Sequence, residues 1–149
     1  MIELIRKINV SVNAQSENLV VRASTGAHKI ILDESEVYGG QNKGPHPMET
    51  LLATLASGTN ITANMIAAEM YFDLRGLTFD VYGVFDPFGV MGDATVHPFY
   101  EQVTVNVEVD TTEDDAEIQA LKRQVEARCP IYTLFKAAGV KMNDTWVKA

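Results

Sequence analysis

The stretch GPHPMETLLATLASGTNITANMIAAEM, residues 44–70, is the longest run of helical hydrophobic periodicity in the chain. Pro45 and Pro47 suit the start of a helix, and Glu49 falls in the first turn, where a carboxylate meets the positive end of the helix dipole. Apolar or small residues then recur at three- and four-residue spacing, at Leu51, Leu52, Leu55, Thr59, Thr62, Met65 and Ile66. This pattern predicts one long helix with a buried stripe, around which the other elements pack.

Three short segments before this helix have the composition of strands. They span residues 3–12, 19–23 and 28–32. Polar residues 13–18 and the pair Thr25-Gly26 provide turns between them, and short links favour an antiparallel meander. Residues 33–46 have no periodicity and predict a loop that leads to the long helix.

The second half of the chain alternates strands and helices. Strands are predicted at residues 77–85, 102–109 and 142–147, with a loop at 86–98. Thr111 or Thr112 can cap a helix whose buried face is Ile118, Leu121 and Val125. Pro130 starts a shorter helix over 131–138, and Gly139 fits its end. The order βββ-α-ββ-αα-β predicts a single α+β domain over residues 1–149.

Composition and charge argue against several kinds of partner and indicate where the protein is located. The net charge of -8 and the lack of a basic run argue against nucleic acid. No apolar run reaches the roughly 20 residues of a membrane span, and residues 1–12 lack the pattern of a signal peptide. With one cysteine, no disulfide can form within the chain, so we expect a cytoplasmic protein. The three histidines do not have metal-ligand spacing, so neither metal nor cofactor is expected.

Cys129 is the first candidate for chemistry. Pro130 after it places the sulfur near a helix N-terminus, and Arg128 is adjacent, two features that favour a thiolate. A buried structural cysteine is the alternative, since free cysteines are among the most buried residues. A cycle with two thiols inside one chain is excluded, because no second cysteine could resolve the oxidised sulfur.

Other candidates lie on or beside the long helix. His46 flanks its start and is otherwise an ordinary loop histidine. Glu49 is either a dipole partner or a carboxylate that positions an arginine or a polar substrate. Small residues at Ser57, Gly58 and Thr59 permit close approach of another helix, and Ser57 lacks the surroundings of a hydrolase nucleophile.

The run Gly44-Pro45-His46-Pro47-Met48-Glu49, followed by residues 51–56, resembles the OsmC/Ohr family of osmotically induced and organic hydroperoxide resistance proteins. The segment Cys129-Pro130-Ile131 with Leu134 resembles the second cysteine motif of that family. The resemblance implies an OsmC-like two-layer fold with a long central helix, built as an intertwined homodimer. It also implies thiol-dependent reduction of organic hydroperoxides at sites between the subunits.

The carry-over of the family's residues is partial. Glu49 matches its carboxylate and Cys129 its second, resolving cysteine, whereas the first, peroxidatic cysteine falls at Gly58. The activating arginine falls in or near residues 13–18, which contain none. Arg22 lies a few residues away, and the role is not carried over to it. Two of the four catalytic parts are therefore missing, and normal peroxidase activity is not expected.

Three functions follow as hypotheses. The first is a divergent, homodimeric member that binds a small apolar ligand at the subunit interface, in the room left by Gly58 and lined by Ser57, Thr59 and His46. The second is a one-cysteine peroxidase in which Cys129, aided by Glu49, attacks a peroxide and an external thiol resolves it. The third is a structural or partner-binding protein with a vestigial pocket.

Overall fold

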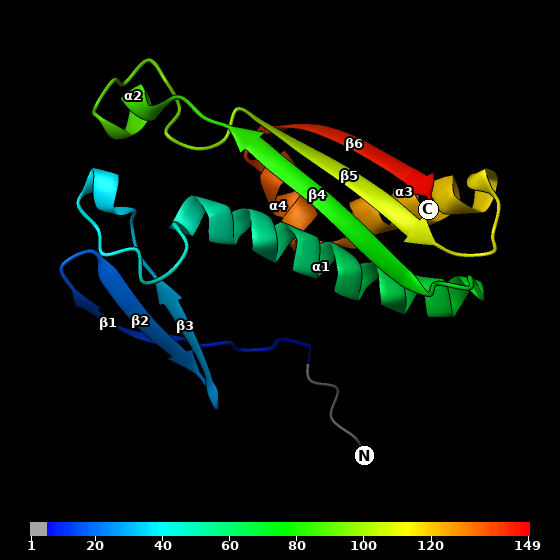
Figure 1. Ribbon diagram of the computed structural model, residues 1–149. Coiled ribbons are helices and arrows are strands. Elements are labelled where there is room, and N and C mark those ends of the chain that lie inside the picture. The colour runs from blue at the N-terminus through cyan, green and yellow to red at the C-terminus, as the bar shows by residue number, and fades with distance from the viewer. Residues whose placement is uncertain (1–5) are drawn as a thin grey trace. The chain divides into compact units, whose positions relative to one another are not determined.

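The computed structural model describes residues 6–149, which divide into two compact units on either side of the Thr50–Leu51 bond. The first contains β1 (Asn13–Glu17), β2 (Val20–Thr25), β3 (His28–Leu32) and the short 3-10 helix η1 (Glu36–Tyr38). Helix α1 (Pro47–Met70) lies mostly in the second. There it is followed by β4 (Gly76–Val84), α2 (Pro87–Val90), β5 (Gln102–Asp110), α3 (Asp115–Arg128), α4 (Pro130–Ala137) and β6 (Lys141–Lys148), as Figure 1 shows.

The three N-terminal strands form the predicted antiparallel meander in the order β1-β2-β3, but the first strand lies elsewhere. Residues 6–12 are not in a strand, and residues 3–5 lie outside the described part of the chain. Strand β1 instead occupies residues predicted as a turn. All five of its residues are exposed, so backbone pairing with β2 forms this strand without the apolar alternation that would reveal it.

The loop between β3 and α1 is organised by a buried carboxylate, Asp33. Its oxygens accept backbone N–H bonds from Glu34 at 2.7 Å and from Gln41 and Lys43 at 3.1 Å. Burial opposes the charge, but these hydrogen bonds outweigh it and lower the pKa of Asp33. The Asp33 side chain thereby holds the two ends of the loop segment 34–43 together.

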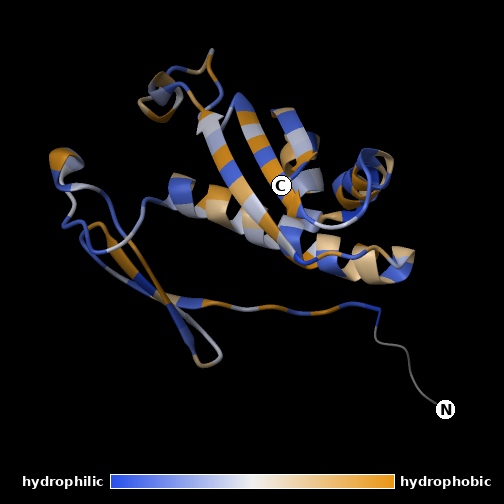
Figure 2. Cartoon of the chain, turned by 45° about the vertical axis from the view of Figure 1, so that its right-hand side comes forward, coloured by the Kyte–Doolittle hydropathy of each residue, from blue (hydrophilic) through white to orange (hydrophobic). Residues whose placement is uncertain are grey.

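Helix α1 confirms the long predicted helix, with a different buried face. The residues that it buries are Leu55, Thr59, Thr62, Ala63, Ile66 and Ala67. Leu51 and Met65, predicted in the buried stripe, are instead 38% and 49% exposed. Four of these six side chains are small, those of Thr59, Thr62, Ala63 and Ala67. Figure 2 shows pale and orange residues along the helix. The helix ends before Tyr71, whose φ of 55° is left-handed.

The second unit is built on a sheet in the order β4-β5-β6. Strand β5 pairs antiparallel with β4 and parallel with β6, and α3 and α4 make the crossover between the parallel strands. The four predicted valines of β5 are all buried, at Val103, Val105, Val107 and Val109. Trp146 of β6 lies opposite Val107 in the same core.

The two C-terminal helices meet at Cys129. Helix α3 buries the predicted Ile118, Leu121 and Val125, but its N-cap is Asp114, which accepts the N–H of Glu117 at 2.9 Å. The predicted caps were wrong, because the Thr111 hydroxyl instead donates to the Asp73 carbonyl at 2.6 Å. Across residues 6–149, no helix combines the length and apolarity that crossing a membrane requires.

Candidate functional site

Cys129 is the N-cap of α4, as the Cys-Pro pair predicts. Its sulfur accepts the backbone N–H of Tyr132 at 3.4 Å, and Pro130 occupies the first helical position. The residue is completely buried. A peroxide therefore reaches this sulfur only if the surrounding helices open.

Gly58 lies directly against Cys129, across the contact between α1 and α4. A Cβ placed on Gly58 would lie 3.6 Å from the Cys129 sulfur, 3.3 Å from Cβ of Ile131 and 2.7 Å from its Cγ1. The last distance is shorter than real Cβ contacts allow. The Ile131 side chain thus fills the space that a residue larger than glycine would take, and the expected room beside Gly58 is occupied within the single chain.

The neighbours of Gly58 on α1 point in different directions. Ser57 is exposed, whereas Thr59 is buried. The Thr59 hydroxyl has no hydrogen-bond partner among the described residues, which is uncommon for a buried polar group. Ser57 and Thr59 therefore do not share one surface with Gly58 in this unit.

Glu49 and His46 cap the start of α1. The Glu49 carboxylate accepts the backbone N–H of His46 at 3.0 Å, and Nδ1 of His46 accepts the N–H of Met48 at 3.0 Å. The two bonds form a variant of the capping box, in which the His46 side chain accepts from the second helical residue instead of the third. Since Nδ1 accepts, the ring proton lies on Nε2, which is 3.1 Å from Glu34.

His46 also lines a cavity of about 320 Å³ in the first unit, together with Leu19, Leu32, Tyr38 and Pro47. Both His46 and Glu49 belong to this unit, whereas Gly58 and Cys129 belong to the second. The grouping of Glu49 and His46 with Gly58 and Cys129 in one site stays a prediction.

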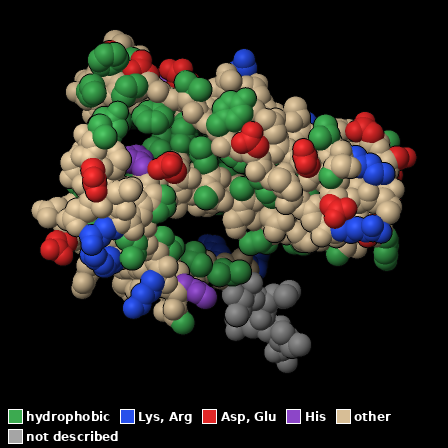
Figure 3. Space-filling view, in the orientation of Figure 1, with side chains coloured by type: hydrophobic (Ala, Val, Ile, Leu, Met, Phe, Trp, Pro, Cys, Tyr) green, Lys and Arg blue, Asp and Glu red, His purple; other side chains and the backbone are tan. Residues whose placement is uncertain are grey.

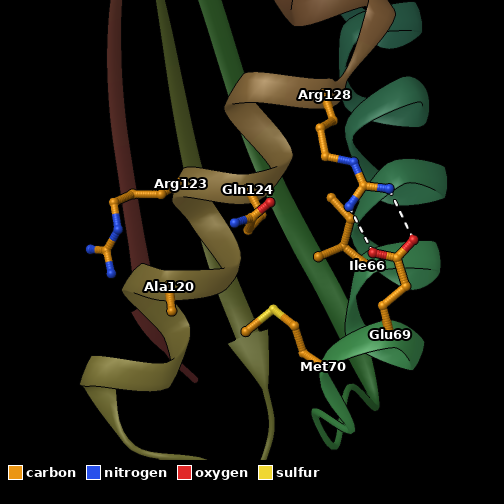
Figure 4. A pocket seen from close by; sticks show the side chains of 7 residues that line it. All are labelled: Ile66, Glu69, Met70, Ala120, Arg123, Gln124 and Arg128. Atoms are coloured by element: carbon orange, nitrogen blue, oxygen red, sulfur yellow. Dashed lines mark hydrogen bonds and ion pairs between the residues drawn. The ribbon is translucent and has the colours of Figure 1, made fainter.

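Arg128, which the sequence places next to Cys129, pairs with Glu69 instead of with the Cys129 sulfur. Its guanidinium forms two parallel hydrogen bonds, of 2.7 and 2.9 Å, with the Glu69 carboxylate on α1 (Figure 4). This pairing lowers the pKa of Glu69 and leaves the two terminal nitrogens of Arg128 engaged. A cavity of about 360 Å³ lies between α1 and α3 beside the pair; Figure 4 shows the Arg123 side chain directed away from Arg128 and Glu69.

A smaller, wholly apolar pocket lies two helical turns before Gly58 on α1. Its volume is about 130 Å³, and it is lined by Leu51, Phe99, Tyr100, Leu134, Phe135, Ala138 and Val140. Tyr100 and Phe135 stack with ring centroids 6.5 Å apart, which gives one wall an aromatic surface. The pocket therefore suits a small apolar group rather than an ion.

Three features of the site lie within one stretch of the chain: the motif at the start of α1, Gly58 and the Cys-Pro cap of α4. A family model described as OsmC-like protein matches residues 40–143, which include all three features. The chain belongs to the OsmC-like protein family. No curated protein sequence matches it.

Solved structures share this OsmC-like fold over nearly their whole length. An OsmC-like protein from Mycoplasma pneumoniae aligns with a TM-score of 0.82 and 22% identity, covering 97% of this chain and 99% of that one. The organic hydroperoxide resistance protein OsmC from Legionella pneumophila aligns with a TM-score of 0.69 and 14% identity, over 95% and 97%. The organic hydroperoxide resistance protein OhrB of Bacillus subtilis aligns with a TM-score of 0.66 and 14% identity, covering 93% of this chain and 98% of that one.

Sequence reasoning missed the contact that fills the space at Gly58 in this OsmC-like chain. The role of Ile131 depends on how α1 and α4 pack, so no local pattern could indicate that its side chain covers Gly58. Arg22, the arginine nearest to the expected activating position, is an exposed residue of β2 opposite Gln15.

Proposed function

We propose that this chain is a divergent OsmC-like protein that does not carry out the two-thiol reduction of organic hydroperoxides. In that cycle one thiolate attacks the peroxide, releasing an alcohol and leaving a sulfenic acid, and a second thiol then forms a disulfide with loss of water. The observation that carries the proposal is that Gly58, not a thiol, faces the buried Cys129 sulfur. One sulfur cannot complete the cycle.

The test is consumption of an organic hydroperoxide with dithiothreitol or a dihydrolipoyl donor. We expect the rate to equal that of the buffer and thiol alone, and to be the same for the wild type and Cys129→Ser. Catalytic turnover that survives in the Cys129→Ser variant would reveal a reaction centre elsewhere. Turnover that is lost in that variant leads to the alternative below.

The alternative is a one-cysteine peroxidase, and the N-cap position of Cys129 is the observation in its favour. A thiolate there would attack the peroxide, and two external thiols would reduce the sulfenic acid in turn, through a mixed disulfide and with release of water. Complete burial of the sulfur weighs against this reading. Rapid, saturable turnover that depends on Cys129 would establish it and overturn the first proposal.

A homodimer is the second part of the proposal, because the first unit leaves its apolar side chains uncovered. Among residues 6–50 only Val20 and Asp33 are buried. Ile8, Val10 and Val12 alternate along an extended segment and are 85%, 93% and 60% exposed. Phe88 and Val90 of α2 and the following Met91 form a further exposed apolar group (Figure 3, upper left). Such surfaces are typical of interfaces, and a second copy would cover them.

The ligand that we propose is small and apolar, and a peroxide with an apolar substituent belongs to the same class. Because Ile131 occupies the space at Gly58, the pocket lined by Leu51 and Phe135 is a better candidate for the ligand site than the space beside Gly58. Its volume of about 130 Å³ suits a compact hydrocarbon group. A cytoplasmic location also stays a prediction, which rests on the single cysteine.

Ala138→Leu, which adds three carbons to the pocket wall, tests the ligand. Native mass spectrometry after gentle purification, or titration with a small aromatic hydrocarbon followed by NMR, should show binding to the wild type and roughly tenfold weaker binding to the variant. Ala137→Leu is the matched control, since Ala137 is adjacent on α4 and does not line the pocket. Equal binding by both variants would contradict this site. Absence of both binding and turnover would favour the third, structural class.

A further inference from the structure

Three polar side chains meet between α3, α4 and β6, away from the family motifs. They are Glu126 of α3, Tyr132 of α4 and Asp144 of β6. The Tyr132 hydroxyl donates a short hydrogen bond to Oδ2 of Asp144. The Asp144 and Glu126 carboxyl groups also act on each other electrostatically, which places them close together.

Two of these carboxyl oxygens have no donor. Oε1 of Glu126 and Oδ1 of Asp144 are both buried and without a hydrogen-bond partner among the described residues. The ammonium of Lys122 lies 3.7 Å from Oε1 of Glu126, beyond hydrogen-bond distance. Two carboxylates this close would repel each other, whereas one proton between them would satisfy both buried oxygens.

We propose that Glu126 and Asp144 share one proton and that this proton joins α3, α4 and β6 around Cys129. Glu126 carries it, because Asp144 already accepts the Tyr132 hydroxyl and must present its other oxygen as an acceptor. Tyr132 extends the link, since its backbone N–H donates to the Cys129 sulfur. Loss of the proton sets two negative charges against each other next to the residue that contacts Cys129.

The charge balance supports loss of this proton near neutral pH. Burial above all, and then the hydrogen bond and the charge of Asp144, raise the pKa of Glu126 to about 7, while Lys122 opposes the shift. Burial and the same two carboxyl groups also raise the pKa of Tyr132, so its hydroxyl stays a donor. Within residues 6–149, Lys122 of α3, Tyr132 of α4 and Asp144 of β6 are the titratable groups found to act on Glu126.

The sign of the pH dependence follows from linkage. Between the ordinary glutamate pKa of 4.5 and about 7, the folded chain holds a proton that the unfolded chain has released. Stability is therefore fully present below the lower value, falls as the pH rises through this window and levels off above it. From pH 5 to pH 8 the unfolding equilibrium constant should increase on the order of fiftyfold from this group alone.

The experiment compares urea unfolding of the full chain at pH 5 and pH 8 for the wild type, Glu126→Gln and Glu117→Gln. The glutamine amide at position 126 can donate to Asp144 permanently, so this variant should lose most of the decrease in stability that the wild type shows. Glu117 is exposed on the same helix, and its substitution should leave the decrease intact. Parallel pH profiles of the wild type and Glu126→Gln would overturn the proposal.

Carboxyl carbon NMR of the wild type provides a measurement that does not depend on a variant's stability. The Glu126 side-chain carbon should titrate with a midpoint near pH 7. A midpoint in the ordinary range of glutamate would show that no proton is shared. Alkylation of Cys129 at pH 8 should also be several times faster in the wild type than in Glu126→Gln, and equal rates would contradict the link to Cys129.

Discussion

At the scale of single residues, Gly58 and Ile131 form a matched pair. The glycine gives up helix propensity, about 1 kcal/mol relative to alanine, at a position where only a hydrogen fits against the Ile131 side chain. In the contact between α1 and α4, the Ile131 side chain thus occupies the place that a side chain at position 58 would take. A side chain introduced at position 58 would therefore first have to displace the Ile131 side chain.

We expect Gly58→Ala to lower the free energy of unfolding by about 1 kcal/mol, because overpacking of about 1–3 kcal/mol exceeds the gain in helix propensity. In an Ile131→Ala background, which removes the atom at 2.7 Å, the same change should instead stabilise the protein by about 1 kcal/mol. Urea denaturation of the four proteins gives the coupling energy. If Gly58→Ala has the same effect in both backgrounds, Ile131 does not fill this space.

At the scale of elements, the loop before α1 depends on the Asp33 carboxylate rather than on apolar contacts. Its three backbone hydrogen bonds hold residues 34–43 and so fix where α1 begins. The lowered pKa means that this stabilisation is present above the ordinary aspartate pKa of 3.8 and is lost as the pH falls through the lower folded value.

Asp33→Asn should therefore lower the melting temperature at pH 7, since the amide group cannot accept on both atoms. The difference from the wild type should shrink as the pH falls below about 3.8, where Asp33 of the unfolded chain takes up a proton, and should vanish below the lower pKa of the folded chain. Thermal unfolding followed by circular dichroism measures both effects. Glu36→Gln, an exposed change in the same loop, is the control, and a pH-independent difference for Asp33→Asn would contradict the account.

Elements with strong local patterns could be predicted from the sequence. The alternating valines of β5 and the apolar spacing of α3 report burial directly, and Pro130 marks the break between the two helices. Strand β1 could not be predicted, since its polar residues pair only through the backbone. For the site, the capping position of Cys129 could be predicted, because Pro130 follows it. The Ile131 contact and the Glu126–Asp144 pair could not, because both depend on tertiary packing.

At the scale of the whole molecule, the proposed homodimer gives the exposed residues 8–12 a role. Val10→Glu should weaken self-association at least tenfold, because burying a valine side chain contributes about 1.5–3 kcal/mol and a buried carboxylate costs more. Sedimentation equilibrium over a range of concentrations measures the change. Asn9→Glu, on the alternate side of the same segment, should have a much smaller effect; equal effects, or a monomeric wild type, would contradict the proposed interface.

The central claim is that an OsmC-like scaffold here holds one buried sulfur against a glycine and does not complete the thiol cycle of hydroperoxide reduction. The most direct measurement is the mass of the intact protein after treatment with an organic hydroperoxide in the presence of a sulfenic-acid trap. We expect Cys129 to remain a free thiol over the time in which a catalytic thiol would react completely. Stoichiometric trapping of Cys129 on that timescale, absent in Cys129→Ser, would contradict the claim.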